Sequence, residues 1–184
     1  MSEKRETYGI DIAGIHRELE LFEIKPGLRI AILNILGDTE LVEACAKALA
    51  EKLSDIEFDV LVTAEAKSIP IAYALSVVTG KPFAILRKTY KAYMGDAIAS
   101  ETLSITTGKP QTLYLDEKDR KLIDGHKVVI VDDVISTGST LQGMRMILEK
   151  AGGTITAEVA ILTEGERAKW ADIIALGHLP VFSD

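Results

Sequence analysis

The chain has 184 residues, of which 47% are hydrophobic and 27% charged, and it carries a formal net charge of −7 and a single cysteine. Such a chain is expected to fold as one domain, residues 1–184, with a real core. The negative charge argues against nucleic acid as a partner, and the single Cys45 excludes a disulfide framework. No apolar run reaches about 18 residues and the polar start has no signal-peptide layout, so we expect a soluble cytoplasmic protein without a membrane partner.

The first half of the chain alternates expected strands with expected helices. A helix is plausible around residues 14–21, and residues 29–36 are predicted to form a strand. Asp38 or Thr39 can cap the next helix. The buried stripe expected on that helix consists of Leu41, Cys45, Ala48, Leu49 and Leu53. Strands at 59–63 and 83–86 flank a further helix, which Ser68 can cap, Pro70 can begin and Gly80 can end.

The second half continues the alternation after a long, polar, glycine-interrupted stretch at residues 87–115. The four branched apolar residues at 128–131 are typical of a central parallel strand that is buried on both faces. An apolar pattern of period 3.6 predicts a helix over residues 141–151. Further strands are expected at 157–162 and 172–176, and Trp170 is expected to pack on the core. This order predicts an α/β fold with an open, mainly parallel sheet flanked by helices.

The most informative stretch is residues 128–140, where the predicted strand leads into two adjacent acids, Asp132 and Asp133. A loop rich in hydroxyl groups follows and leads into a helix; it contains Ser136, Thr137, Gly138, Ser139 and Thr140. Loop amides at a helix N-terminus suit a phosphate, and the acids can accept hydrogen bonds from neighbouring sugar hydroxyls. Paired acids also occur as magnesium ligands or phosphorylation sites, and a Ser/Thr/Gly cluster is often only a turn. The combination in this context favours a site for a phosphorylated sugar.

Two further strand-end loops supply positive charge to this acidic chain. Lys67 follows the strand at 59–63, and Arg87, Lys88 and Lys91 follow the strand at 83–86. Each loop taken alone is also compatible with an ordinary solvated turn. Beside a phosphate site, a clamp for a polyanion is the better explanation, because such a ligand needs focused positive charge.

The 128–140 stretch resembles the signature of the type I phosphoribosyltransferases, which bind 5-phosphoribosyl-1-pyrophosphate (PRPP). The order Glu65-Ala66-Lys67, then Arg87-Lys88-x-x-Lys91, then this signature is similar to the adenine phosphoribosyltransferase branch over roughly residues 20–182. The resemblance implies the open parallel sheet of that family. It also implies a small hood, made from about residues 1–35 and the C-terminal segment, and a flexible lid loop at about 92–115.

The resemblance also implies roles for the candidate residues. Asp132 and Asp133 would hold the ribose hydroxyls and are the catalytic candidates, while residues 136–140 would wrap the 5′-phosphate. The residues expected to face the pyrophosphate are Lys67, Arg87, Lys88 and Lys91. Mg²⁺ would arrive largely on PRPP oxygens, so no protein ligand to the metal is assigned. The implied protein is a homodimeric pentosyltransferase of purine salvage, which transfers the phosphoribosyl group to a purine base.

Two departures from the adenine branch, and one from the hypoxanthine–guanine branch, leave the identity of the base undecided. Pro26-Gly27 is followed by an apolar run without the usual Phe-Arg-Asp-Ile-like element, and Thr106-Thr107-Gly108 stands where the lid usually carries Glu-Tyr-Gly. Ser136 stands where the hypoxanthine–guanine branch usually has Asp, and this difference argues against that branch. Adenine is the first expectation for the base. The alternatives are transfer to xanthine or another base, or a PRPP-sensing regulatory protein that performs no transfer.

Overall fold

The structure, a computed structural model, describes residues 5–103 and 110–183. A five-stranded sheet with strand order β10-β9-β8-β4-β5 forms its centre, and all the neighbouring strands of this sheet are parallel. The central strands are Val60–Ala64 (β4), Phe83–Leu86 (β5), Lys127–Ile135 (β8), Thr154–Glu164 (β9) and Ile174–Leu179 (β10). This arrangement confirms the predicted α/β fold.

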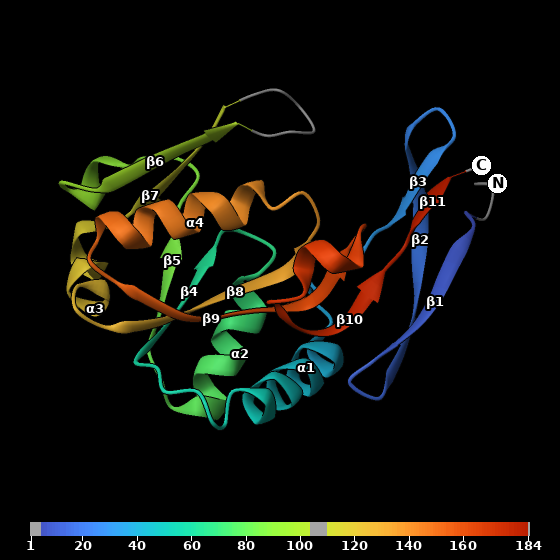
Figure 1. The fold of residues 1–184 in the computed structure, drawn as a ribbon, viewed down its shortest axis with the longest axis horizontal. Helices are drawn as coiled ribbons and strands as arrows, with labels where there is room; N and C mark the ends of the chain where they lie inside the picture. The colour runs from blue at the N-terminus through green and yellow to red at the C-terminus, as the bar shows by residue number, and fades with distance from the viewer. Residues whose placement is uncertain (1–4, 104–109, 184) are drawn as a thin grey trace.

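Helices cover both faces of the central sheet, as Figure 1 shows. The helices α1 (Thr39–Lys52) and α2 (Ile69–Thr79) lie on one face, and α4 (Ser139–Lys150) lies on the other. Alternate residues of β8 serve the two layers: Val129 and Val131 belong to the core beneath α1 and α2, whereas Val128 and Ile130 belong to the core beneath α4. Burial on both faces explains why this strand has a continuous apolar sequence.

The predicted helix boundaries of the first half are confirmed, with two corrections. Asp38 caps α1 by accepting a hydrogen bond from the Leu41 amide at 3.2 Å. Gly80 ends α2 in the left-handed conformation, with φ of 67°. Within the predicted stripe of α1, Ala48 is only half-buried, and Val42 and Ala46 are buried instead. Ser68 stands at the N-cap of α2 but makes no capping hydrogen bond there, so its predicted capping role was wrong.

The helix expected around residues 14–21 was also wrong, because this segment belongs to an antiparallel sheet. β1 (Thr7–Ile12) and β2 (Ile15–Lys25) pair across a turn in which Ala13 and Gly14 both have positive φ. This is the backbone geometry of a tight hairpin. Exposed His16, Glu18 and Glu20 alternate with more buried residues, which gives β2 the period of a strand.

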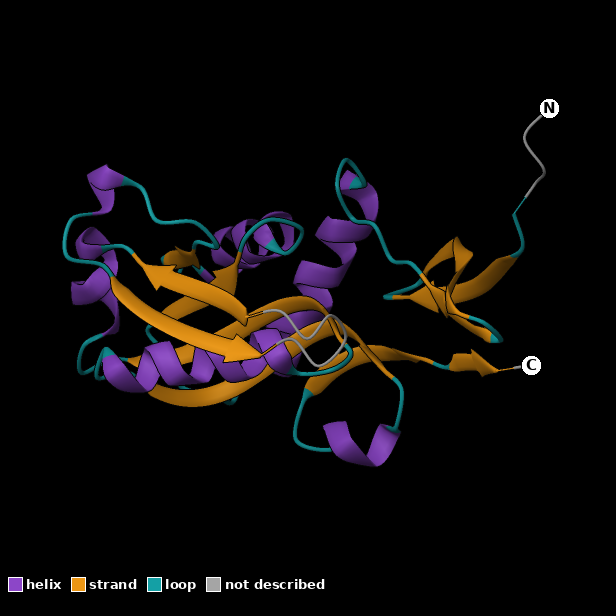
Figure 2. Cartoon of the chain, turned by 90° about the horizontal axis from the view of Figure 1, so that it is seen from above, coloured by secondary structure: helices purple, strands orange, loops and turns teal. Residues whose placement is uncertain are grey.

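The rest of this sheet comes from both ends of the chain. β3 (Leu28–Ala31) pairs with β2 on one side and with β11 (Val181–Ser183) on the other. The strand predicted at 29–36 therefore ends at Ala31. Figure 2 shows this four-stranded sheet at one end of the molecule, beside the central sheet. We call the sheet β1-β2-β3-β11 the hood.

The segment predicted as a lid loop, residues 92–115, contains regular structure. A short 3₁₀ helix, η1 (Ala92–Met94), precedes the antiparallel strands β6 (Ile98–Leu103) and β7 (Pro110–Leu115). Met94, Leu113 and Leu115 are buried, and the strand pair lies beside α4 (Figure 2). The segment is therefore not an open loop throughout, and its role as a lid stays a prediction. Residues 104–109, including Thr106-Thr107-Gly108, lie outside the described residues.

The remaining described helices are short. They are η2 (Glu117–Asp119), α3 (Arg120–Ile123) and η3 (Arg167–Trp170). Within residues 5–103 and 110–183, no helix is both long enough and apolar enough to cross a membrane.

Candidate functional site

Two adjacent carboxylates at the end of β8 form the centre of the candidate site. Asp132 and Asp133 are 8% and 7% exposed, and the Ser68 hydroxyl lies 2.7 Å from Asp132 Oδ1 and 3.1 Å from Asp133 Oδ1. Lys67 Nζ lies 3.1 Å from Asp133 Oδ2. The β4–α2 loop and the end of β8 therefore meet, as expected where neighbouring parallel strands end at the same sheet edge.

The close approach of the two acids changes their protonation. Burial, together with the negative charge of Asp133, raises the pKa of Asp132 to about 7, and the hydrogen bond from Ser68 acts in the opposite direction. Two adjacent buried carboxylates are costly to ionise together. A ligand that brings hydroxyl donors or positive charge to the pair favours its ionised form.

Asp132 lines the same small polar hollow as the predicted phosphate loop. This hollow, of about 40 Å³, is also lined by Ser136, Thr137, Gly138 and Thr140. Gly138, with φ of 82°, stands directly before α4, so the loop residues lie at the N-terminus of that helix. Ser139 is buried and does not line the hollow; its hydroxyl lies 3.1 Å from that of Thr137. The structure thus places one acid beside a helix N-terminus suited to an anion.

The helix η3 packs against this loop, a contact that was not predicted from the sequence. A Cβ atom on Gly138 would stand 2.7 Å from the Trp170 ring, so the indole packs directly against the loop backbone. Lys169 Nζ donates a hydrogen bond to the Thr137 carbonyl at 3.1 Å. The predicted core packing of Trp170 is confirmed, since this residue is 9% exposed. Its contact with a loop about thirty positions earlier left no signal in the sequence.

The predicted pyrophosphate cations fall into two groups. Arg87 Nε donates to Glu65 Oε2 at 2.6 Å, and the Lys88 amide donates to Glu65 Oε1 at 2.6 Å. Burial raises the pKa of Glu65, but the hydrogen bonds from Lys88 and Arg87 outweigh burial and leave that pKa below its ordinary value. Glu65 thus joins the loop of Lys67 to the loop of Arg87. Lys88 and Lys91 have exposed side chains that form no ion pair within the described residues.

A second hollow, of about 330 Å³, lies between β2 and the segment that follows β3. Its lining includes Phe22, Ile32, Leu33 and Asn34. Lys67 connects this hollow with the acid pair, because Lys67 Nζ also donates to the Leu33 carbonyl at 2.8 Å. No side-chain pattern in the sequence predicts this connection, because Leu33 contributes a backbone group.

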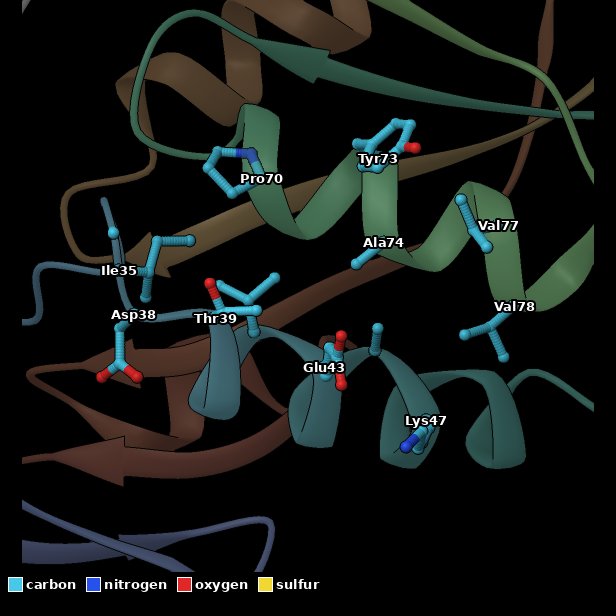
Figure 3. Close-up of a pocket in the computed structure, with 13 residues that line it drawn as sticks. Ile35, Asp38, Thr39, Glu43, Lys47, Pro70, Tyr73, Ala74, Val77 and Val78 are labelled. Atoms are coloured by element: carbon cyan, nitrogen blue, oxygen red, sulfur yellow. The ribbon is translucent and has the colours of Figure 1, made fainter.

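An apolar groove lies away from the acids, between α1 and α2. Figure 3 shows this groove, of about 550 Å³, with Tyr73, Val77 and Val78 on α2 and Glu43 and Lys47 on α1. None of the predicted site residues lines it. The groove is therefore a separate feature of the surface. Among residues 5–103 and 110–183, no group of three or more His, Cys, Asp or Glu side chains is arranged to hold a metal ion.

The central parallel sheet, with paired acids at the end of β8 and a hydroxyl loop before α4, defines the type I phosphoribosyltransferase fold. A family profile described as "Phosphoribosyl transferase domain" matches residues 32–174. The crystal structure of adenine phosphoribosyltransferase from Thermoanaerobacter pseudethanolicus has the same fold, with a TM-score of 0.66 at 22% identity over 94% of this chain and 95% of that one. The chain belongs to the phosphoribosyltransferase family.

Curated relatives differ in the base that their names specify. The adenine phosphoribosyltransferase of Thermosipho africanus is 31% identical over 91% of this chain and 98% of its own length. The hypoxanthine/guanine phosphoribosyltransferase of Methanothermococcus okinawensis is 40% identical over 62% of this chain. The purine biosynthesis repressor PurR of Bacillus subtilis is 30% identical over 78% of this chain. The chain spans 49% of the repressor's length and 58% of the hypoxanthine/guanine enzyme's length.

Proposed function

We propose that this protein transfers the phosphoribosyl group of PRPP to a purine base, producing a nucleoside 5′-monophosphate and pyrophosphate. The observation that carries the proposal is the position of Asp132. Its carboxylate lines one hollow together with the hydroxyl loop at the N-terminus of α4. A sugar phosphate bound there would meet phosphate donors and a hydroxyl acceptor at the same time.

The proposed chemistry relies mainly on orientation and charge. Asp132 and Asp133 would hold the ribose hydroxyls, and the four loop residues that line the hollow, Ser136, Thr137, Gly138 and Thr140, would hold the 5′-phosphate. Lys67, with Arg87, Lys88 and Lys91 on the neighbouring loop, would stabilise the pyrophosphate as the bond to carbon 1 breaks and negative charge grows on the leaving group. A ring nitrogen of the base then forms the new bond to carbon 1. Fixing the two reactants beside each other lowers the entropic part of the barrier.

Magnesium is the cofactor that this proposal includes. The acid pair fits a nearby divalent cation, because two adjacent buried carboxylates face only one lysine, Lys67, within the described residues. The ion would neutralise charge on the pyrophosphate, and most of its ligands would come from PRPP and water.

For the base, we propose the 330 Å³ hollow beside the hood, with adenine as the first candidate. Phe22 and Ile32 offer apolar surface for a flat ring, and Asn34 offers polar groups. The hydrogen bond between Lys67 and the Leu33 carbonyl joins this hollow to the proposed donor site. The relative from Thermosipho africanus, which is similar over nearly its whole length, supports adenine, whereas xanthine or another base remains the alternative.

A PRPP-sensing regulatory protein is the second candidate function. Similarity to the Bacillus subtilis repressor over 78% of this chain favours it. Such a protein would keep the acid pair and phosphate loop but would release no pyrophosphate.

We further propose that the α1–α2 groove receives a second copy of this chain. α2 carries no charged residue and leaves Tyr73 and Val77 59% and 64% exposed, which is unusual for a helix that faces water. Glu43 and Lys47 stand one turn apart on α1, so two copies related by a twofold axis can pair each acid with the other copy's lysine.

Light scattering of the purified protein should give the mass of a dimer. Val77→Glu should give a monomer and Glu51→Lys, outside the groove, should not; a monomeric parent protein would contradict this proposal.

One experiment decides between transfer and sensing. The protein is incubated with PRPP, Mg²⁺ and a panel of purine bases, and pyrophosphate release is measured. We expect release with adenine. Tight binding of PRPP without release with any base would refute the transferase and support the sensor.

A further inference from the structure

The Ser68 hydroxyl is placed between the two acids rather than at the end of its own helix. Ser68 is 4% exposed, and its Oγ lies 2.7 Å from Asp132 Oδ1 and 3.1 Å from Asp133 Oδ1. It also accepts a hydrogen bond from the Asp133 amide at 3.2 Å. Serine before a helix usually caps the helix amides, yet Ser68 makes no such bond. The buried hydroxyl is therefore committed to the acid pair.

The single hydroxyl proton of Ser68 determines which carboxylate it can donate to. Ser68 has one hydroxyl proton, so it can donate fully to only one of the two carboxylates at a time. The shorter contact assigns that proton to Asp132 Oδ1, which also accepts from the Asp133 amide at 2.9 Å. Both donors therefore converge on one oxygen of Asp132. This leaves the other oxygen of that carboxylate for the hollow that Asp132 lines.

Asp133 depends on Ser68 for a different reason. Lys67 also contacts this carboxylate, with Nζ 3.1 Å from Oδ2. Lys67 is also a proposed pyrophosphate ligand. If Lys67 moves to the pyrophosphate when PRPP binds, Ser68 still fixes the position of Asp133, because its Oγ accepts from the Asp133 amide and lies 3.1 Å from Asp133 Oδ1.

We propose that Ser68 is a positioning residue, which holds Asp132 and Asp133 in the orientation that accepts the ribose hydroxyls of PRPP. This inference rests on the proposed function, because it assumes that the acid pair binds ribose. Its action is indirect, since Ser68 would orient the acids without contacting the substrate itself.

The test compares variants of Ser68 by direct binding of PRPP with Mg²⁺, which needs no base. Ser68→Ala should weaken binding by about tenfold, the usual effect of removing a hydrogen bond to a charged group. Ser68→Thr, which keeps the hydroxyl, should restore most of the affinity. Ser68→Gly provides a second truncation, because glycine is tolerated before a helix. The matched control is Ser76→Ala in α2. This change removes a hydrogen bond of 2.6 Å from the Ser76 hydroxyl to the Lys81 carbonyl, which lies beyond the end of the helix.

A purely structural role for Ser68 predicts a different pattern. The melting temperature would then fall for Ser68→Ala and Ser76→Ala alike, while both variants kept the parent affinity for PRPP. A positioning role instead predicts that only the Ser68 truncations weaken PRPP binding. In these variants the loss of PRPP affinity on acidification should also begin at a higher pH, since the Ser68 hydrogen bond lowers the Asp132 pKa. Parent-like affinity in Ser68→Ala and Ser68→Gly would overturn the inference. Absence of PRPP binding by the parent protein would instead overturn the proposed function.

Discussion

The donor half of the site and the hood are built in different ways. In the donor half, Asp132 and Asp133 belong to the last part of the buried strand β8, and Lys67 lies in the loop after the buried strand β4, so short stretches of sequence fix their positions. In the hood, antiparallel strands from both ends of the chain form a sheet, and the nearby hollow combines Phe22 on β2 with Leu33 beyond β3. The proposed donor site is therefore defined by short stretches of sequence, whereas the proposed base site depends on how distant segments assemble in the folded chain.

The largest effect should come from removing charge at the centre of the donor half. Asp133→Asn should lower kcat/KM by about a thousandfold, because a neutral amide cannot replace a carboxylate that binds ribose and faces Lys67. Steady-state assays of pyrophosphate release measure this effect. Asp55→Asn, on an exposed position, is the control. Full activity in Asp133→Asn would show that catalysis does not need the Asp133 carboxylate.

The phosphate loop should be the next most sensitive part. Gly138→Ala places a Cβ atom 2.7 Å from Trp170 at a backbone φ of 82°, so the loop must shift. We expect PRPP affinity to fall by about a hundredfold, the loss of several phosphate hydrogen bonds. Gly80→Ala is the matched control, since Gly80 also has positive φ but nothing lies within 4 Å of the added atom. Equal PRPP affinities in the two variants would show that this loop does not bind the phosphate.

A variant beside the hood separates the two halves. Phe22→Ala removes apolar surface from the 330 Å³ hollow, so KM for the base should rise by about tenfold. The affinity for PRPP, measured by calorimetry without base, should stay at the parent value. A fall in PRPP affinity with no change in KM for the base would reverse our assignment of the halves.

The smallest expected effect concerns stability and pH. Because the folded-state pKa of Asp132 is raised to about 7, the native protein binds more protons than the unfolded chain between about pH 4 and 7. The contribution of Asp132 to the free energy of unfolding therefore becomes more unfavourable as the pH rises through this window. Asp132→Asn removes that cost and should raise the melting temperature by about 4 °C at pH 8, with little change at about pH 4, below the window. A lower melting temperature for the variant at pH 8 would contradict the raised pKa.

The central sheet and the position of the hydroxyl loop before α4 could be predicted from the sequence because each depends on neighbouring residues, whereas phosphate binding by this loop stays a prediction. A continuous apolar run marks β8, and Asp38, Gly80 and the loop before α4 mark helix ends. Within the hood, residues 14–21 were mistaken for a helix although β2 alternates with a period of two, and the Ala13–Gly14 turn was available as a hairpin signal. The contacts of Ser68 with the acids and of Trp170 with Gly138 could not be predicted, because they join residues that only the folded chain brings together.

The central claim is that the end of β8 and the loop before α4 bind PRPP. Calorimetric titration of the parent protein with PRPP and Mg²⁺, without any base, tests it most directly. The account predicts one PRPP per chain, displaced by ribose 5-phosphate and by pyrophosphate, and a strongly reduced affinity in Gly138→Ala. Absence of binding, or binding that Gly138→Ala leaves unchanged, would contradict it.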